Sequence, residues 1–288
     1  MKAILKREFA SYFNTLTGWI FVAALLAFTG IYFMILNLFQ GSVFFASTLD
    51  QIRYIFLITV PILTMRCFAE ERRMQTDQLL LTAPVTEEDI VLGKYGALLC
   101  VLAIPMGISC LCPLIIRLCG SAFLGADYAA IGMFFLLGAA QLAVGMLISA
   151  LTGSQLIAAG LSFCALLLLY LWDGLVEYLP VSAVGSLIGI LVILLLLTAL
   201  FYAISRDRRM AAVLLAGGSV LLVGWYFLDT RRFAGMLPDA LKLFSLHAAF
   251  RTAASEHILD IRGVLLYLTV IVMAIMLTVT AIRSRRWN

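Results

Sequence analysis

The stretch RCFAEERRMQTDQLLLTAPVTEEDIVLGKY, residues 66–95, is charged and polar, and it separates two long apolar segments. Similar apolar runs recur along the chain, and about 20 such residues form a helix that crosses a bilayer. Hydrophobic residues make up 64% of the 288 residues and charged residues 12%, against about 25% charged in soluble domains. Lipid offers the backbone no hydrogen-bond partners, so such segments fold as helices. The sequence predicts an all-α, polytopic membrane protein.

Eight apolar segments are candidates for membrane spans. They are expected at about 18–38, 53–69, 96–117, 128–150, 155–172, 183–204, 210–228 and 263–282. The second is short, and the seventh is interrupted by glycines. We expect the whole chain, 1–288, to form one transmembrane domain, with an extracytoplasmic loop over 229–262.

The basic residues predict the orientation of these spans. With both termini in the cytoplasm, thirteen of the twenty Lys and Arg residues fall on the inside. Five of the seven on the outside lie in the long loop before the last span, and long loops follow the positive-inside rule least. We therefore expect both termini to be cytoplasmic, in a bacterial-type inner membrane.

The N-terminal segment MKAILKREFASYFNTLTGW has the pattern of a helix that lies in the membrane interface. At helical spacing its large apolar residues share one face, and its three basic residues lie elsewhere. Such a pattern is typical of an interfacial helix, expected here over 1–17. A simple extension of the first span is the alternative.

Several classes of function are disfavoured by what the spans lack. Arg66, Arg117, Asp173 and Glu177 fall at or beyond the expected span ends, whereas ion-coupled carriers usually hold a charged group at mid-depth. A sodium site made of hydroxyl and carbonyl oxygens stays open, so an ion-coupled carrier or channel acting without an ATPase remains the alternative function.

Enzyme motifs are also missing from the sequence. It has no HExxH, no GxSxG and no P-loop, since Gly93 and Lys94 are followed by Tyr95. His247 and His257 fall in the outer loop, and we expect His247 to be a hydrogen-bonded surface residue rather than a ligand. We predict no catalytic, cofactor or metal site and no nucleic-acid partner, so energy for any work must come from another polypeptide.

Within 66–95, Ala83-Pro84 ends a first helical run because the residue before proline leaves the α region. A second helix then begins with an N-cap, an acidic first turn and the two positions of a hydrophobic staple. These residues are Val85, Thr86, Glu87, Glu88, Asp89 and Ile90. They predict a short cytoplasmic helix leading through Gly93-Lys94 into the third span. The alternative is a well-capped start to that span, with charges only for solvation.

Three stretches carry a family resemblance. LTMRCFAEERRMQTDQLLLTAPVTEEDIVLGKY (63–95) closely resembles the segment between the second and third spans of ABC-2 type permeases, in particular the gliding-motility-associated branch. LKREFASYFNTLTGWIF (5–21) is similar to the elbow helix of that family, and ILDIRGVLLYLTVIVMAIMLTVTAIRSRRW (258–287) to its last span. The resemblance covers 1–172 and 240–288.

The resemblance implies a permease fold of the type V exporter kind and a mechanism. Segment 70–94 would be the coupling segment, seated in a separate ATPase subunit that binds the ATP and magnesium. Two ATPase chains and a second permease chain, identical or related, would complete the exporter within membrane lipid. The residues implied in ATPase coupling are Thr86, Glu87, Glu88, Asp89, Ile90, Glu70, Glu71, Arg72 and Arg73.

The sequence departs from that family pattern in two places. Gln75 stands where the family usually has glycine before the threonine, here Thr76. The family core has six spans, so the segment 183–228 would be an extra transmembrane hairpin. Its role and the transported substrate do not follow from the residues.

Overall fold

The computed structural model describes residues 2–74, 86–205, 208–228, 233, 235–256 and 261–286. Within these residues every regular element is a helix, as predicted for an all-α protein. The chain divides into two compact units, which are treated separately below. Unit 1 comprises Met1–Tyr170 and Leu246–Asn288, and unit 2 comprises Leu171–Ser245.

Unit 1 contains most of the helices. They are α1 (Lys2–Asn14), α2 (Leu16–Phe33), η1 (Met34–Phe39), α3 (Ala46–Ile52), η2 (Arg53–Ile55), α4 (Phe56–Thr64), α5 (Ala69–Arg73), α7 (Glu87–Ser109), α8 (Leu111–Cys119), α9 (Leu124–Leu151), most of α10 (Gln155–Glu177), α15 (Leu246–Glu256) and α16 (Ile261–Arg286). Helix α9 is central, since α16, α7, α4, α15 and α3 all pack against it. Most of the buried residues of unit 1 gather around it.

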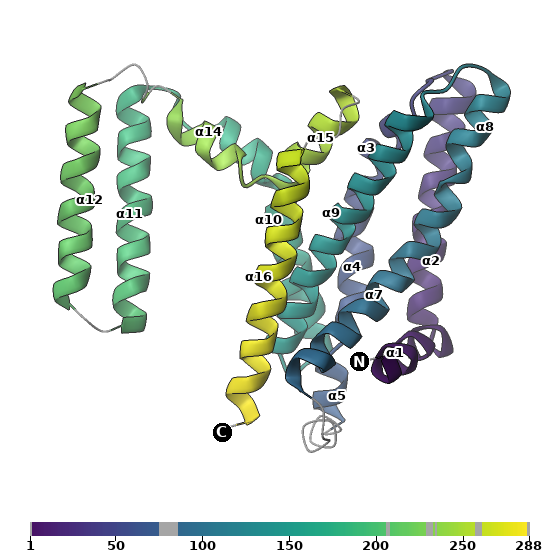
Figure 1. Ribbon diagram of the computed structural model, residues 1–288, viewed down its shortest axis with the longest axis horizontal. Coiled ribbons are helices and arrows are strands. Elements are labelled where there is room, and N and C mark those ends of the chain that lie inside the picture. Colours follow the sequence, from purple (N-terminus) through teal and green to yellow (C-terminus); the bar gives the residue numbers. More distant parts are fainter. Residues whose placement is uncertain are drawn as a thin grey trace. The chain divides into compact units, whose positions relative to one another are not determined.

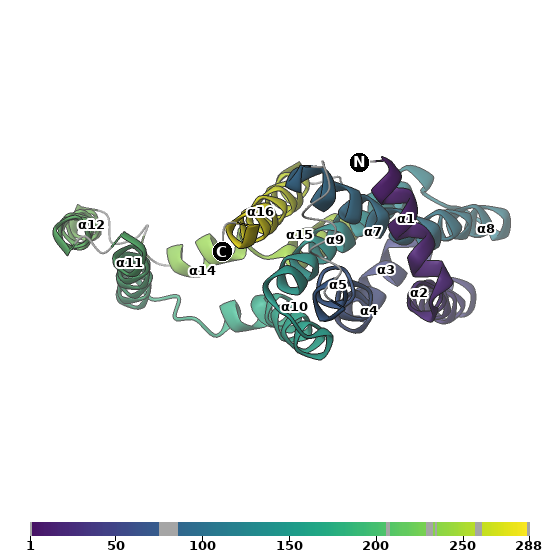
Figure 2. The ribbon, with the colours of Figure 1, turned by 90° about the horizontal axis from the view of Figure 1, so that it is seen from below.

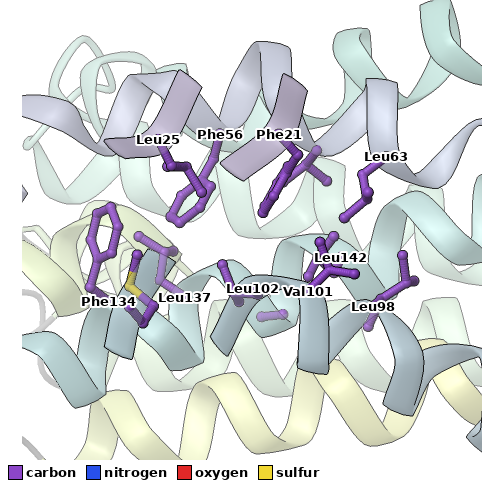
Figure 3. Packing of buried hydrophobic residues seen from close by; sticks show 14 of the residues in the cluster. Phe21, Leu25, Phe56, Leu63, Leu98, Val101, Leu102, Phe134, Leu137 and Leu142 are labelled. Atoms are coloured by element: carbon purple, nitrogen blue, oxygen red, sulfur yellow. The ribbon is translucent and has the colours of Figure 1, made fainter. Parts of the chain in front are cut away.

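The core of unit 1 forms where α2 and α4 face α7 and α9 (Figure 3). The residues shown there are large, apolar and buried, and they point into the space between the two pairs of helices: Phe21, Leu25, Phe56, Leu63, Leu98, Val101, Leu102, Phe134, Leu137 and Leu142. Phe134 anchors the cluster, with its ring centroid 4.7 Å from that of Phe56 and 5.5 Å from that of Phe250. Aromatic contacts at such distances favour one packing geometry.

One end of unit 1 gathers the charged helix ends. Helix α1 lies across the start of α2, and α5 and the C-terminal end of α16 lie at the same end (Figures 1 and 2). We call it the charged end of unit 1. The helix expected over 1–17 is thus present as α1, which packs against α7 and α2. Tyr12 is its buried residue.

Seven helical segments of the described chain are long and apolar enough to span a membrane. They are Leu16–Phe39, Ala46–Arg73, Glu87–Cys119, Leu124–Leu151, Gln155–Glu177, Arg208–Tyr226 and Ile261–Ser284. The eighth expected span, 183–204, corresponds to α11 in unit 2. This helix has 23 residues, Ala183–Ser205, and its apolar stretch within the described side chains is Ala183–Ala199.

Two expected boundaries move because helices continue through polar residues. The third span does not start near residue 96 after a separate short helix, because α7 runs without a break from Glu87 to Ser109. Gly93 is buried inside it. The fifth extends beyond 172 to Glu177. Asp173 therefore lies inside α10, not beyond it, and is buried with Ser245 Oγ donating to its carboxylate.

Unit 2 consists of the end of α10, helices α11 (Ala183–Ser205), α12 (Arg208–Leu228) and α14 (Met236–Lys242), and their connections. Helices α11 and α12 pack side by side as a hairpin, the segment expected over 183–228. Leu237 of α14 packs against α11 at Gly189. Many large apolar side chains of α12 are exposed, among them Val213, Val220 and Leu221. Such exposure is expected of a helix whose surroundings are apolar.

Candidate functional site

The start of α7 presents an acidic helix terminus. Thr86 has an extended backbone and caps the helix, since its Oγ1 accepts a hydrogen bond from Asp89 N at 3.3 Å. Its hydroxyl in turn donates to Asp89 Oδ2 at 3.1 Å. The first turn carries Glu87, Glu88 and Asp89, where negative charge is stabilised by the helix dipole. The predicted N-cap is confirmed. The side chains of Thr86 and Glu88 are exposed at this helix start.

Two turns further along α7, Lys94 forms the centre of a buried ionic cluster. Its side chain is 1% exposed. Nζ donates to Glu71 Oε1 of α5 at 2.8 Å and to the carbonyl oxygen of Cys67 at 2.9 Å. Glu8 Oε1 of α1 lies 3.3 Å from the same nitrogen. The ammonium thus donates two hydrogen bonds and forms an ion pair with Glu8, and the ring of Phe68 lies 5.1 Å away.

Arg7 balances the charge of this cluster. Its Nη2 lies 2.7 Å from Glu8 Oε1 and 3.4 Å from Glu71 Oε1. The hydrogen bond to Glu8 raises the pKa of Arg7 above its ordinary value, despite partial burial, and the charges of both carboxylates add to this. We call Arg7, Glu8, Glu71 and Lys94 the Lys94 cluster. It holds two positive and two negative charges, the pairing that a buried charge requires.

Helix α5 is fastened separately to the C-terminal end of α9. Ser149 Oγ accepts hydrogen bonds from the backbone N–H groups of Phe68 and Ala69, both at 3.2 Å. Arg72 donates to the carbonyl oxygens of Thr152 at 2.9 Å and Ala150 at 2.8 Å. These carbonyls end α9 and have no partner within it. The short helix is therefore held by side chains at both of its ends.

The structure divides the expected coupling residues into two groups. Glu71 and Arg72 are engaged inside the chain as described above, and Glu70 accepts a bidentate pair from Arg66 at 2.6 and 2.7 Å. Ile90 is 2% exposed and faces the core. The residues that present surface are Thr86, Glu87, Glu88, Asp89 and Arg73. Val85, Gln75, Thr76 and Ala83-Pro84 lie outside the described residues.

The end of the last span reaches the same surface. Arg283 Nη2 of α16 lies 3.8 Å from Glu88 Oε1, and both side chains are more than half exposed. An ion pair so exposed contributes little to stability. It does place Glu88 beside the C-terminal end of α16, at the charged end of unit 1.

Comparison with known proteins assigns the chain to a family. Residues 29–207, more than half of the sequence, match the ABC-2 family transporter proteins. The chain belongs to this family. It is an ABC-2 family transporter membrane protein with multiple spans. Members of the family typically lack an ATPase domain, and in general they work with an ATPase partner. No curated protein matches the sequence.

Lys94 is the residue of this ABC-2 protein that sequence reasoning missed. The sequence alone gives it no role in the site, yet it is the most buried charged side chain there. A signal was available, because Ile90, Lys94 and Leu98 recur at four-residue spacing and therefore share one helix face. Ile90 and Leu98 are buried. A lysine between two core positions of the same face requires an acidic partner.

A second polar group of the ABC-2 protein lies about midway along α9. Gln141 Nε2 is 3.2 Å from His247 Nε2, at the start of α15, and each residue is 1% exposed. The ring of Tyr170 meets the imidazole edge to face at 5.1 Å, and Arg53 donates to the carbonyl oxygen of His247 at 3.4 Å. The expectation of a surface histidine is wrong, because the start of α15 packs against α9 and buries the imidazole.

His257 lies outside the described residues. Among the residues that the structure describes, no three His, Cys, Asp or Glu side chains gather into a group that could hold a metal ion.

Proposed function

We propose that the chain is the permease subunit of an ATP-driven exporter of the gliding-motility-associated branch. A separate ATPase subunit, which binds the ATP and magnesium, would dock on the segment 70–94. Two such subunits and a second permease chain, identical or related, would form the working complex. Both termini would be cytoplasmic, in a bacterial-type inner membrane.

One observation carries this proposal. The first turn of α7 presents Thr86, Glu87 and Glu88 on the surface, and the same helix continues into the core of unit 1 through Ile90 and Lys94. A partner that gripped this turn would therefore pull directly on a candidate membrane span. Exposed charges in such a place set the orientation and specificity of docking. Among the remaining expected residues, Glu71 holds α7 through Lys94, whereas Glu70 and Arg72 hold α5 in place.

The orientation has support within unit 1. The N-terminal helix α1, the C-terminal end of α16 and the start of α7 share one end of the unit, joined by the pairs Lys94–Glu8 and Arg283–Glu88. The basic residues of α1 and of the last span then lie on the side of the ATPase, in agreement with the positive-inside rule. On this proposal α1 is the elbow helix, 183–228 an extra hairpin, and 229–262 the outer loop.

The experiment is co-purification with a candidate ATP-binding subunit from the same organism. Glu88→Arg reverses an exposed charge with only a weak partner in the chain, so we expect loss of the complex without a change in thermal unfolding. Asp89→Arg should act in the same way, with some loss of the helix cap as well. Asp239→Arg, at an exposed position of α14 in the expected outer loop, is the matched control and should leave the complex intact.

If the Glu88→Arg and Asp89→Arg chains still co-purify with the ATPase and still stimulate its ATP hydrolysis, docking on this turn is wrong.

A further inference from the structure

The Lys94 cluster joins the two ends of the segment 70–94, on which the ATPase would dock. Glu71, near the start of the segment 70–94, and Lys94, at its end, are joined at 2.8 Å. A force on this segment would therefore act on α5 and α7 together, through this buried pair.

The same cluster joins the interfacial helix α1 to α7. Glu8 lies 3.3 Å from Lys94 Nζ, and one turn away α1 and α7 approach closely. A Cβ placed on Gly96 would lie 2.9 Å from Leu5 Cδ1, which is too short for an unshifted contact. Thr15 alone separates α1 from α2. A shift of α7 would thus be passed through α1 to the base of the first candidate span.

The charges of the Lys94 cluster make this joint, the contact between α1, α5 and α7, depend on direction. An apolar contact would not have this property. The Lys94 ammonium donates hydrogen bonds to α5 and to the turn before it, and it forms an ion pair with Glu8 of α1. An apolar side chain could slide along its neighbours, whereas these donors fix one arrangement of the three elements. Buried polar groups specify geometry in some other proteins.

We propose that Lys94 is a positioning residue that makes α1, α5 and α7 move as one body when the ATPase moves the docking segment. The proposal rests on the proposed function for the source of the movement. It goes further in naming the residue through which the movement enters the first span. Lys94 touches neither ATP nor cargo, and its role is to transmit.

The first test measures how tightly α1 and α7 are held together in the purified chain alone. Spin labels carried by non-natural amino acids are placed at Ser11 of α1 and Leu92 of α7, both exposed. We expect one narrow distance distribution in the parent chain and a broad one in Lys94→Met. Lys6→Met, which removes an exposed lysine of α1, is the matched control and should leave the distribution narrow.

The second test separates binding from transmission in the complex with the ATPase. Lys94→Met should bind the ATPase with unchanged affinity, yet lose about tenfold or more of the hydrolysis that the permease stimulates, within the usual range of coupling between sites. Glu88→Arg should instead lose binding. A purely structural role of Lys94 would lower the melting temperature and the yield, but leave stimulated hydrolysis per bound complex unchanged, and that result overturns the proposal.

A second variant covers the case in which Lys94→Met fails to fold. The triple change Glu8→Gln, Glu71→Gln and Lys94→Met removes both carboxylates along with the ammonium. None of these three buried side chains then carries a charge without a partner. This triple variant should fold, and it should show the same broad distribution of spin-label distances as Lys94→Met. It should also show the same loss of stimulated ATP hydrolysis. Full stimulation with a narrow distance distribution in this variant would also overturn the proposal.

The two proposals fail in different ways. If the parent chain binds no ATPase, the proposed function fails, while the distance measurement still judges the joint. If the parent complex forms and Lys94→Met matches it in distances and in hydrolysis, the joint fails and the proposed function stands.

Discussion

Two of the buried polar sites of unit 1 meet the cost of burial with different chemistry. The Lys94 cluster uses four charged groups, and two of its carboxylates, Glu8 and Glu71, keep 13% and 19% of their side-chain surface. The pair Gln141–His247, about midway along α9, uses a neutral amide and an imidazole, each 1% exposed. Of these two sites, the ionic one keeps more contact with water than the neutral one.

The difference follows from the cost of removing each group from water. A buried amide or imidazole needs hydrogen bonds, whereas a buried ion needs an opposite charge as well. In a membrane protein the cost of an ion rises toward the middle of the span. A cluster at the end of α7 can therefore be ionic and strongly directional, while a contact at the middle of α9 must be weaker. The charged end is suited to transmit force and the middle of α9 to hold α15 in place.

The largest effect is expected at the ionic site. Lys94→Met leaves Glu8 and Glu71 with only the half-exposed Arg7 between them, and breaking a buried ion pair in this way costs about 3 kcal/mol or more. We expect a clear fall in the thermal unfolding temperature of the detergent-purified chain. Lys6→Met should leave that temperature unchanged. A Lys94→Met chain as stable as the parent would show that the cluster is hydrated and that the contrast between the two sites is false.

A smaller effect is expected at the neutral site. Gln141→Leu removes one hydrogen-bond partner of a buried imidazole, which costs about 1–3 kcal/mol. Combining it with His247→Leu should recover part of the loss, because replacing both partners with apolar groups leaves neither of them unsatisfied. A double-mutant cycle on unfolding free energies measures this coupling. Gln51→Leu, at an exposed position of α3, is the control, and additive losses at Gln141 and His247 would mean that the two do not interact.

Much of this fold was predictable because its signals are local. Hydropathy over about 20 residues marks a span wherever its neighbours lie, and Thr86 with the acids after it marks a helix start. Such signals explain why the all-helical fold, most of the spans and the N-cap of α7 were predicted correctly. They also explain the error at the third span, whose apolar window begins near residue 96 although α7 already starts at Glu87 and continues through the polar residues.

The two polar sites depend on contacts between distant parts of the chain. Lys94 meets Glu8, which is in another helix far away in sequence, and His247 is buried only because the start of α15 lies against α9. Residue type does not decide such cases either. Glu70, Glu71 and Arg72 have the composition of a docking surface, yet each is engaged within unit 1. Spacing along one helix could reveal that Lys94 faces the core, but not which acids it meets.

The smallest effect is expected in the pH dependence of stability, near the ionic site. Tyr12 of α1 packs at the edge of the Lys94 cluster and is 6% exposed. Burial raises the pKa of its phenol well above the ordinary value, and the nearby Cys67 and Glu8 add to this. The folded chain therefore retains the phenolic proton at pH values where the unfolded chain has lost it. Stability from this group is complete below about pH 10, the unfolded pKa, and is lost as the pH rises above it.

At pH 11 the loss from this one phenol is at most about 1.4 kcal/mol, the cost of keeping a group with an unfolded pKa of about 10 protonated. Tyr12→Phe should remove it, so the variant should lose less stability than the parent between pH 8 and pH 11 in chemical unfolding. Tyr178→Phe, at a position 90% exposed, should follow the parent. If Tyr12→Phe also follows the parent, water reaches the phenol, and the edge of the Lys94 cluster is wetter than its burial indicates. The ionic site would then owe its charges to hydration as well as to pairing.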